Sequence, residues 1–255
     1  MPFVNIDGLK TYYESKGKGK PLILVHGAGG ASTYWFNQLS ALSEKLWVIA
    51  IDLPGHGKSE PLKRKPTIEQ YADHTTDLVR NMKLQKVVLL GHSMGGLVAQ
   101  QMALKNPELL EKLIIVGSGP KLPETPSAVS SRSGLSFDTK TLASSLFSQK
   151  TLRKMDAVSL MKQITQGMDP DFALRVLMLD FELAGTADFA KRLKDIKIPT
   201  LIVHGADDII PILSAKYLHE NINGSKLEVI RDAGHMVMME KPDEFNNAIL
   251  RFIEN

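Results

Sequence analysis

Short aliphatic runs recur along the chain, and most are followed by a segment with apolar residues at helical spacing. The runs lie at residues 21–25, 46–51, 86–90, 113–116, 198–203 and 227–230. Continuous apolar runs of this length are typical of strands that are buried on both faces of a parallel sheet. Strand–helix alternation therefore predicts an α/β fold, in which a mostly parallel, twisted sheet carries helices on both faces.

The amino-terminal end has a different pattern. Residues 3–6 and 9–14 flank Asp7-Gly8, a pair that is typical of a tight hairpin turn. Further along, Gln70 follows Thr67 at the spacing of a capping box, which predicts that a helix begins there. Other helices are expected at residues 32–45, 94–105, 213–221 and 242–253.

The alternation is interrupted in the second half of the chain. Residues 121 to about 135 are rich in proline and serine and predict a flexible connection, and every segment from 139 to 194 has a helical pattern. We expect a core formed by residues 1–120 and 196–255, with residues 121–195 inserted as a helical cap over the carboxyl ends of the strands.

One apolar run leads directly into the motif Gly91-His92-Ser93-Met94-Gly95. A serine on a sharp strand-to-helix turn is held with its hydroxyl exposed, and the flanking glycines avoid collisions with the neighbouring backbone. The N-terminus of the following helix supplies N–H groups and a partial positive charge. The motif in this context makes Ser93 a candidate nucleophile.

Composition narrows the classes of chemistry. The 255 residues include no cysteine, which excludes disulfides, thiolate metal sites and a cysteine nucleophile. A formal net charge of +3 is too small to predict nucleic acid or an anionic membrane as a partner. No secretory signal and no apolar run long enough to span a bilayer are visible, so we expect a soluble, cytoplasmic protein.

Four motifs, which follow one another along the chain in the expected order, resemble those of the α/β-hydrolase family, specifically its small lidded, esterase-like members. These are His26-Gly27-Ala28-Gly29-Gly30, the Ser93 motif extended by Gly96, Gly205-Ala206-Asp207-Asp208, and Gly234-His235. The resemblance spans nearly the whole chain. It implies a catalytic triad in the order Ser, Asp, His.

The resemblance also implies the roles of individual residues. His235 would be the base that activates Ser93, and the backbone N–H groups of Ala28 and Met94 would form the oxyanion hole. Counting from the glycine at the strand end gives Asp208 as the acid, whereas counting back from Pro211 gives Asp207. We favour Asp208, because the strand end anchors the geometry better than a downstream loop does.

The remaining histidines are expected to have no catalytic role: His26, His56, His74, His92, His204 and His219. A Gly-rich phosphate-binding loop is not favoured, since neither a G-x-G-x-x-G motif nor a Walker lysine follows the first parallel strand. No cofactor and no metal are expected.

The expected function is hydrolysis of small or medium carboxylic esters through an acyl-enzyme intermediate. Methionines in the cap and after His235 predict a tolerant apolar pocket for a small ester or related acyl substrate. Several alternatives use the same triad: carbon–carbon bond hydrolysis, lactonase, thioesterase or perhydrolase activity, or a ligand receptor with slow turnover. The family's ring-cleavage hydrolases typically have tryptophan where this chain has Met236. The oligomeric state does not follow from the sequence.

Overall fold

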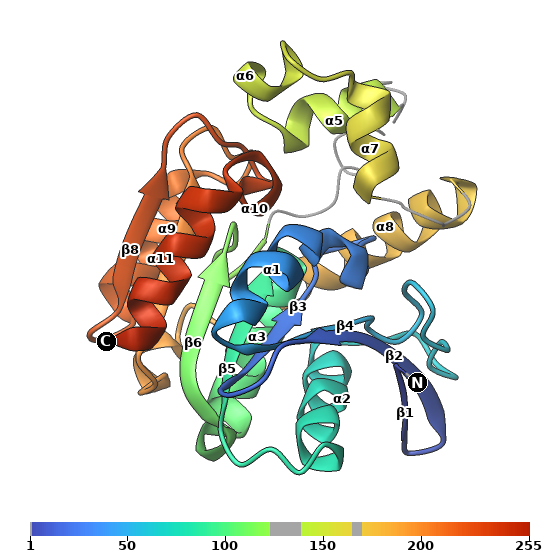
Figure 1. Ribbon diagram of the computed structural model, residues 1–255, viewed down its shortest axis with the longest axis vertical. Coiled ribbons are helices and arrows are strands. Elements are labelled where there is room, and N and C mark those ends of the chain that lie inside the picture. Colours follow the sequence, from blue (N-terminus) through green and yellow to red (C-terminus); the bar gives the residue numbers. More distant parts are fainter. Residues whose placement is uncertain (1, 123–138, 165–169) are drawn as a thin grey trace.

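A single eight-stranded sheet forms the centre of the computed structural model (Figure 1), which describes residues 2–122, 139–164 and 170–255. The strand order is β1-β2-β4-β3-β5-β6-β7-β8. Strands β1 and β2 pair antiparallel, as do β2 and β4, and all other pairs are parallel. The strands are β1 (Phe3–Ile6), β2 (Leu9–Lys16), β3 (Pro21–Val25), β4 (Trp47–Ile51), β5 (Val87–His92), β6 (Leu110–Val116), β7 (Thr200–Gly205) and β8 (Lys226–Ile230). The predicted α/β fold is confirmed.

Helices pack on both faces of the sheet. One face carries α2 (Ile68–Asn81), α3 (Met94–Lys105) and α9 (Ile212–Asn221), and the other carries α1 (Phe36–Ala41) and α11 (Pro242–Glu254) (Figure 1). The short α10 (Val237–Glu240) leads into α11. The predicted helix over 32–45 is divided, because 3₁₀ turns at Ser32–Trp35 and Leu42–Glu44 flank α1.

Local chemistry explains where two of these elements begin. Asp7 and Gly8 both have positive φ, 49° and 85°, as the two central residues of a tight hairpin turn require. Helix α2 begins after Thr67, whose side chain accepts a hydrogen bond from the Gln70 N–H at 3.1 Å. Both features agree with the patterns in the sequence.

The core has two parts, separated by the sheet. Along β3, Ile23 and Val25 belong to the cluster beneath α2 and α3, whereas Leu22 and Leu24 belong to the cluster beneath α1 and α11. All four side chains are fully buried. Because successive side chains point to opposite faces, a strand covered on both sides has a continuous apolar run rather than an alternating pattern.

Within the described residues, four α-helices lie between β6 and β7, beyond the carboxyl ends of the strands (Figure 1). They are α5 (Thr139–Leu146), α6 (Gln149–Leu152), α7 (Ala157–Ile164) and α8 (Pro170–Gly185). The predicted connection over 121–135 falls almost wholly outside the described residues. The cap boundaries at 121 and 195 stay a prediction. No helix among the described residues has the length and apolar character needed to cross a membrane.

Candidate active site

Ser93 occupies a strained position between β5 and α3. Its φ of 55° and ψ of −118° are unusual for a non-glycine residue, and its N–H donates to the Val116 carbonyl at 2.9 Å. A side chain at Gly91 would collide with the backbone of Gly95, and one at Gly95 would collide with the carbonyls of Val25 at the end of β3 and of His26. The glycines of the motif therefore permit the close approach of β3, β5 and α3 that holds this turn.

His235 and Asp208 form a hydrogen-bonded pair. His235 Nδ1 lies 2.8 Å from Asp208 Oδ1, and the Ile210 N–H donates to the same oxygen at 2.8 Å. The Asp208 side chain is fully buried. Burial alone would raise the pKa of this carboxyl group, but His235, His204 and the Ile210 N–H together lower it below the ordinary 3.8. Asp208 therefore stays ionised beside His235.

The alternative acid lies elsewhere. Asp207 is exposed to solvent, and its backbone N–H donates to the Ala233 carbonyl at 2.9 Å. No hydrogen bond joins its carboxylate to His235 within the residues that the structure describes. The geometry thus favours Asp208 over Asp207 as the residue that orients the imidazole.

The contact with Asp208 determines the tautomer of His235. A carboxylate only accepts, so Nδ1 carries the proton, and Nε2 is left with a lone pair when the ring is neutral. Neither Nε2 nor the Ser93 hydroxyl makes a hydrogen bond to another group among the described residues. An imidazole with one nitrogen held and the other open has the arrangement that a general base needs.

His92, inside the serine motif, contacts His235 directly. Its Nε2 donates to the His235 backbone carbonyl at 2.9 Å, and the two ring centroids are 4.6 Å apart. Burial, followed by the neighbouring His235, lowers the pKa of His92 to about 3. His92 is thus a neutral group that connects the serine turn to the loop carrying His235.

Sequence reasoning missed Gly117, which follows β6. Its φ is +51°, and a Cβ there would lie 3.0 Å from Asp208 Oδ2 and 3.3 Å from His235 Nδ1. The glycine gives the acid and the imidazole room to meet. Its place directly after an apolar run, in Gly117-Ser118-Gly119-Pro120, was the signal that could have revealed it.

The two proposed oxyanion donors belong to the helix that follows Ser93 and to the glycine-rich loop that packs on it. Met94 is the first residue of α3, where helix geometry leaves the N–H without an intrahelical acceptor. The Ala28 N–H makes no hydrogen bond within the described residues. Neighbouring Gly27 packs on the serine, since a Cβ on Gly27 would lie 3.0 Å from Ser93 Cβ. Two free donors next to the serine are what an oxyanion hole requires.

A family model described as the alpha/beta hydrolase family matches residues 22–248. The chain belongs to the alpha/beta hydrolase family. Membership makes the protein a hydrolase and confirms the resemblance found in the sequence.

Several relatives of this alpha/beta hydrolase cover nearly all of it. The 2-hydroxy-6-oxo-6-(2'-aminophenyl)hexa-2,4-dienoic acid hydrolase of Metapseudomonas resinovorans is 30% identical, over 98% of this chain and 90% of its own. A solved thermophilic esterase from Thermogutta terrifontis is 29% identical, covers 96% and 93% of the two chains, and has a TM-score of 0.84. An N-acyl homoserine lactone degrading enzyme is 27% identical, covers 98% and 100%, and has a TM-score of 0.86.

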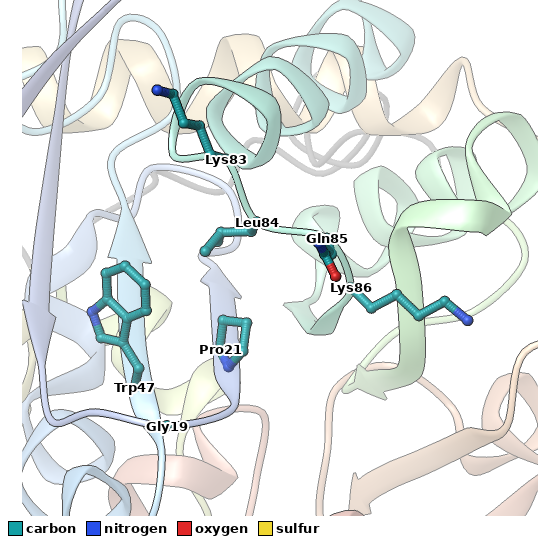
Figure 2. A pocket seen from close by; sticks show the side chains of 7 residues that line it. All are labelled: Gly19, Pro21, Trp47, Lys83, Leu84, Gln85 and Lys86. Carbon is teal, nitrogen blue, oxygen red and sulfur yellow. The ribbon is translucent and has the colours of Figure 1, made fainter.

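Two cavities of this hydrolase lie away from Ser93. One, of about 510 Å³, is lined by Gly19, Pro21, Trp47, Lys83, Leu84, Gln85 and Lys86 (Figure 2). Pro21 and Trp47 are the first residues of β3 and β4, so this cavity lies at the opposite end of the parallel strands from Ser93. The other, of about 230 Å³, lies between the α6–α7 region and α10. No cluster of His, Asp or Glu among the described residues could hold a metal ion.

The methionines after His235 belong to the core. Met236 and Met238 are fully buried in the cluster that also contains Phe147 and Leu160 from the cap region. In the cap, Met155 is 40% exposed and Met161 is buried. Another methionine of the predicted cap, Met168, lies outside the described residues. The apolar pocket over Ser93 stays a prediction.

Proposed function

We propose that this alpha/beta hydrolase cleaves small or medium carboxylic esters, with Ser93, His235 and Asp208 as its catalytic triad. The observation that carries the proposal is the strained serine turn next to an imidazole held at 2.8 Å by a buried carboxylate. Ser93 alone would be a weak nucleophile near neutral pH, and the open Nε2 of His235 supplies the base.

The reaction follows from these positions. Ser93 Oγ attacks the ester carbonyl carbon while His235 Nε2 takes its proton, and the resulting oxyanion accepts hydrogen bonds from the Ala28 and Met94 N–H groups. Collapse breaks the bond to the alcohol, which leaves with the proton from His235. Water, deprotonated by His235, then attacks the acyl-enzyme and releases the acid, and the proton returns to Ser93.

The experiment compares Ser93→Ala with Ser118→Ala on 4-nitrophenyl esters of increasing acyl length. Ser118 is a matched control, because it is another buried serine at a neighbouring strand end whose hydroxyl has no partner in the described structure. Loss of Ser93 should reduce kcat by about 10⁶-fold, the size seen when a triad nucleophile is removed. Ser118→Ala should retain wild-type kcat.

Two further measurements test the mechanism. A fluorophosphonate probe should label Ser93, as located by peptide mass spectrometry, and turnover should continue beyond one equivalent of product. A Ser93→Ala variant with full activity would overturn the mechanism. A single burst without further turnover would favour a ligand receptor instead.

Lactones are the second candidate substrates. The N-acyl homoserine lactone degrading enzyme covers 98% of this chain with a TM-score of 0.86, and lactone opening uses the same acyl-enzyme chemistry. Acyl homoserine lactones are therefore added to the ester series. The ratio of kcat/KM for the lactones to kcat/KM for the esters decides which class of substrate the enzyme prefers. Carbon–carbon bond hydrolysis is tested in the same series with a ring-cleavage product, although Met236 occupies the position where tryptophan is typical.

A further inference from the structure

A second buried histidine–carboxylate pair lies at the junction of the core and α8. His56 Nε2 is 2.6 Å from Asp180 Oδ2, and the two side chains are 1% and 0% exposed. His56 belongs to the loop after β4, whereas Asp180 lies on α8, so the pair joins segments 124 residues apart. The ester-hydrolysis mechanism does not use either residue.

The partners of His56 determine its protonation state. Its Nε2 faces the Asp180 carboxylate, and its Nδ1 lies 3.2 Å from the Pro54 carbonyl. Both partners only accept hydrogen bonds, so both ring nitrogens must carry a proton for both contacts to form. The geometry therefore describes an imidazolium cation paired with a carboxylate.

Electrostatics agree with this assignment. Burial would lower the pKa of His56, but the Asp180 carboxylate, the Pro54 carbonyl and Asp52 outweigh it and raise the pKa above the ordinary 6.5. Tyr71 on α2 and His26 after β3 also face the ring. Burial, followed by the nearby His56, lowers the pKa of His26, which leaves His56 as the cation of this cluster.

Asp180 makes a second contact, with the loop that carries Ala28. The same Oδ2 atom accepts a hydrogen bond from the Gly29 N–H at 2.8 Å. Gly29 has a φ of +63°, and a Cβ at this position would lie 2.9 Å from Cβ of Leu177, three residues before Asp180 on α8. Helix α8 thus contacts Gly29 through both a carboxylate and an aliphatic side chain.

We propose that Asp180, held by His56, is a positioning residue for the oxyanion hole, because it fixes Gly29 and with it the adjacent Ala28 N–H donor. This inference rests on the proposed function, since it assigns Asp180 to the loop that stabilises the tetrahedral intermediate. It links a segment of the predicted cap to the reaction without any contact between Asp180 and substrate.

Stability alone would not require this arrangement. Replacing a buried ion pair by apolar side chains of similar volume is often neutral or stabilising, because desolvation offsets the attraction. A hydrophobic contact at residues 56 and 180 could join α8 to the core equally well. It could not accept the Gly29 N–H, and that hydrogen bond sets the orientation of the peptide units around Ala28.

The test compares Asp180→Asn with Glu182→Gln, two isosteric changes that remove a carboxylate charge from the same helix. Glu182 is the matched control, because it pairs with Lys65 at 2.8 Å on the exposed surface and does not contact the Gly29 loop. In Asp180→Asn the neutral amide no longer holds the imidazolium. If the asparagine NH₂ group takes the place of Oδ2, it cannot accept the Gly29 N–H. If the amide oxygen takes that place, a neutral His56 must carry its one proton on Nε2 and loses its contact with the Pro54 carbonyl.

Asp180→Asn should lower kcat on a 4-nitrophenyl ester by about 10- to 100-fold. This loss is smaller than the one expected when an oxyanion donor is removed completely. KM should change less than twofold. Glu182→Gln should match the wild type. Affinity for a trifluoromethyl ketone, whose serine adduct carries an oxyanion, should fall in Asp180→Asn by the same factor as kcat/KM. A purely structural role would not produce this parallel loss.

Two outcomes separate the inference from the function beneath it. If Asp180→Asn folds and keeps wild-type kcat and ketone affinity while Ser93→Ala is inactive, the positioning role is wrong and the triad stands. If Ser93→Ala stays active, the proposed function itself fails. Should Asp180→Asn not fold, His56→Gln serves instead, since its amide still donates to Asp180 but carries no charge. Unchanged kcat in that variant would also overturn the role.

Discussion

Two buried histidine–carboxylate hydrogen bonds within the described residues, His235–Asp208 and His56–Asp180, differ in what the second ring nitrogen does. In the pair of His235 and Asp208, Nδ1 is held and Nε2 makes no hydrogen bond within the described residues. In the pair of His56 and Asp180, both nitrogens are occupied by acceptors. The first ring can take up and release a proton, whereas the second is a fixed charge.

Short distance and deep burial therefore do not identify a catalytic histidine. The pair of His56 and Asp180 is the shorter one, at 2.6 Å against 2.8 Å, and both carboxylates are fully buried. The useful distinction is whether one nitrogen stays open next to a nucleophile. The neighbours agree with the contrast, since His235 packs against His92 of the serine turn, whereas His56 is joined to Gly29 only through Asp180.

The largest effect expected to distinguish the two pairs is on catalysis and concerns Asp208, the proposed acid. In Asp208→Asn the amide can donate to His235 Nδ1, which favours the tautomer with its proton on Nε2 and removes the base. We expect kcat to fall by about 10³- to 10⁴-fold. Asp207→Asn, the adjacent and exposed control, should change kcat less than twofold. Steady-state kinetics on both variants check this, and the reverse ranking would assign the acid to Asp207.

Disrupting the second pair, His56 and Asp180, should lower the stability of the fold. His56→Leu leaves the Asp180 carboxylate buried without a counterion and should lower the free energy of unfolding by about 3–5 kcal/mol. Lys65→Met, which breaks the exposed pair with Glu182, should change it little, because solvent screens exposed ion pairs.

Urea denaturation followed by circular dichroism measures both variants. The double variant His56→Leu with Asp180→Leu should recover part of the loss, since it removes the unpaired charge. An equal loss in the single and double variants would show that packing, rather than charge, is responsible.

The smallest expected effect is a difference in how the two pairs contribute to stability as the pH changes. The pKa of His56 is raised, so its contribution to stability is complete below pH 6.5 and is lost as pH rises through the higher folded-state value. The pKa of Asp208 is lowered, so its contribution is present above pH 3.8 and is lost as pH falls through the lower folded-state value.

Unfolding free energies measured across pH check these opposite signs. The stability difference between wild type and Asp180→Asn should shrink above pH 6.5, and that between wild type and Asp208→Asn should shrink below pH 3.8. The groups facing His56 are Asp180, Asp52, His26 and Tyr71. A His56 contribution that grows as pH rises would contradict the imidazolium assignment.

Much of the fold follows from local patterns. The buried run of β3, the hairpin at Asp7-Gly8 and the cap at Thr67 are each encoded within a few residues, so they could be predicted from the sequence. The division of the helix at residues 32–45 could not, because the turns on both sides of α1 depend on packing against the sheet rather than on helix propensity.

The sequence by itself determined which residues could do chemistry. The serine motif, the glycine-rich loop and the Gly-His pair carry their signal in short spacings, because backbone geometry at a tight turn dictates the residue types that fit. The choice between Asp207 and Asp208 stayed open in the sequence, since two neighbouring carboxylates have nearly the same pattern.

Only the tertiary structure decided which carboxylate meets which imidazole. Asp208 is separated from His235 by 27 residues, and Asp180 from His56 by 124, so no local spacing connects either pair. The assignment depends on where loops from different strands and α8 converge in space, and on which oxygen each ring nitrogen reaches. Contacts of that kind arise from the packing of the whole chain, and short segments of sequence do not contain them.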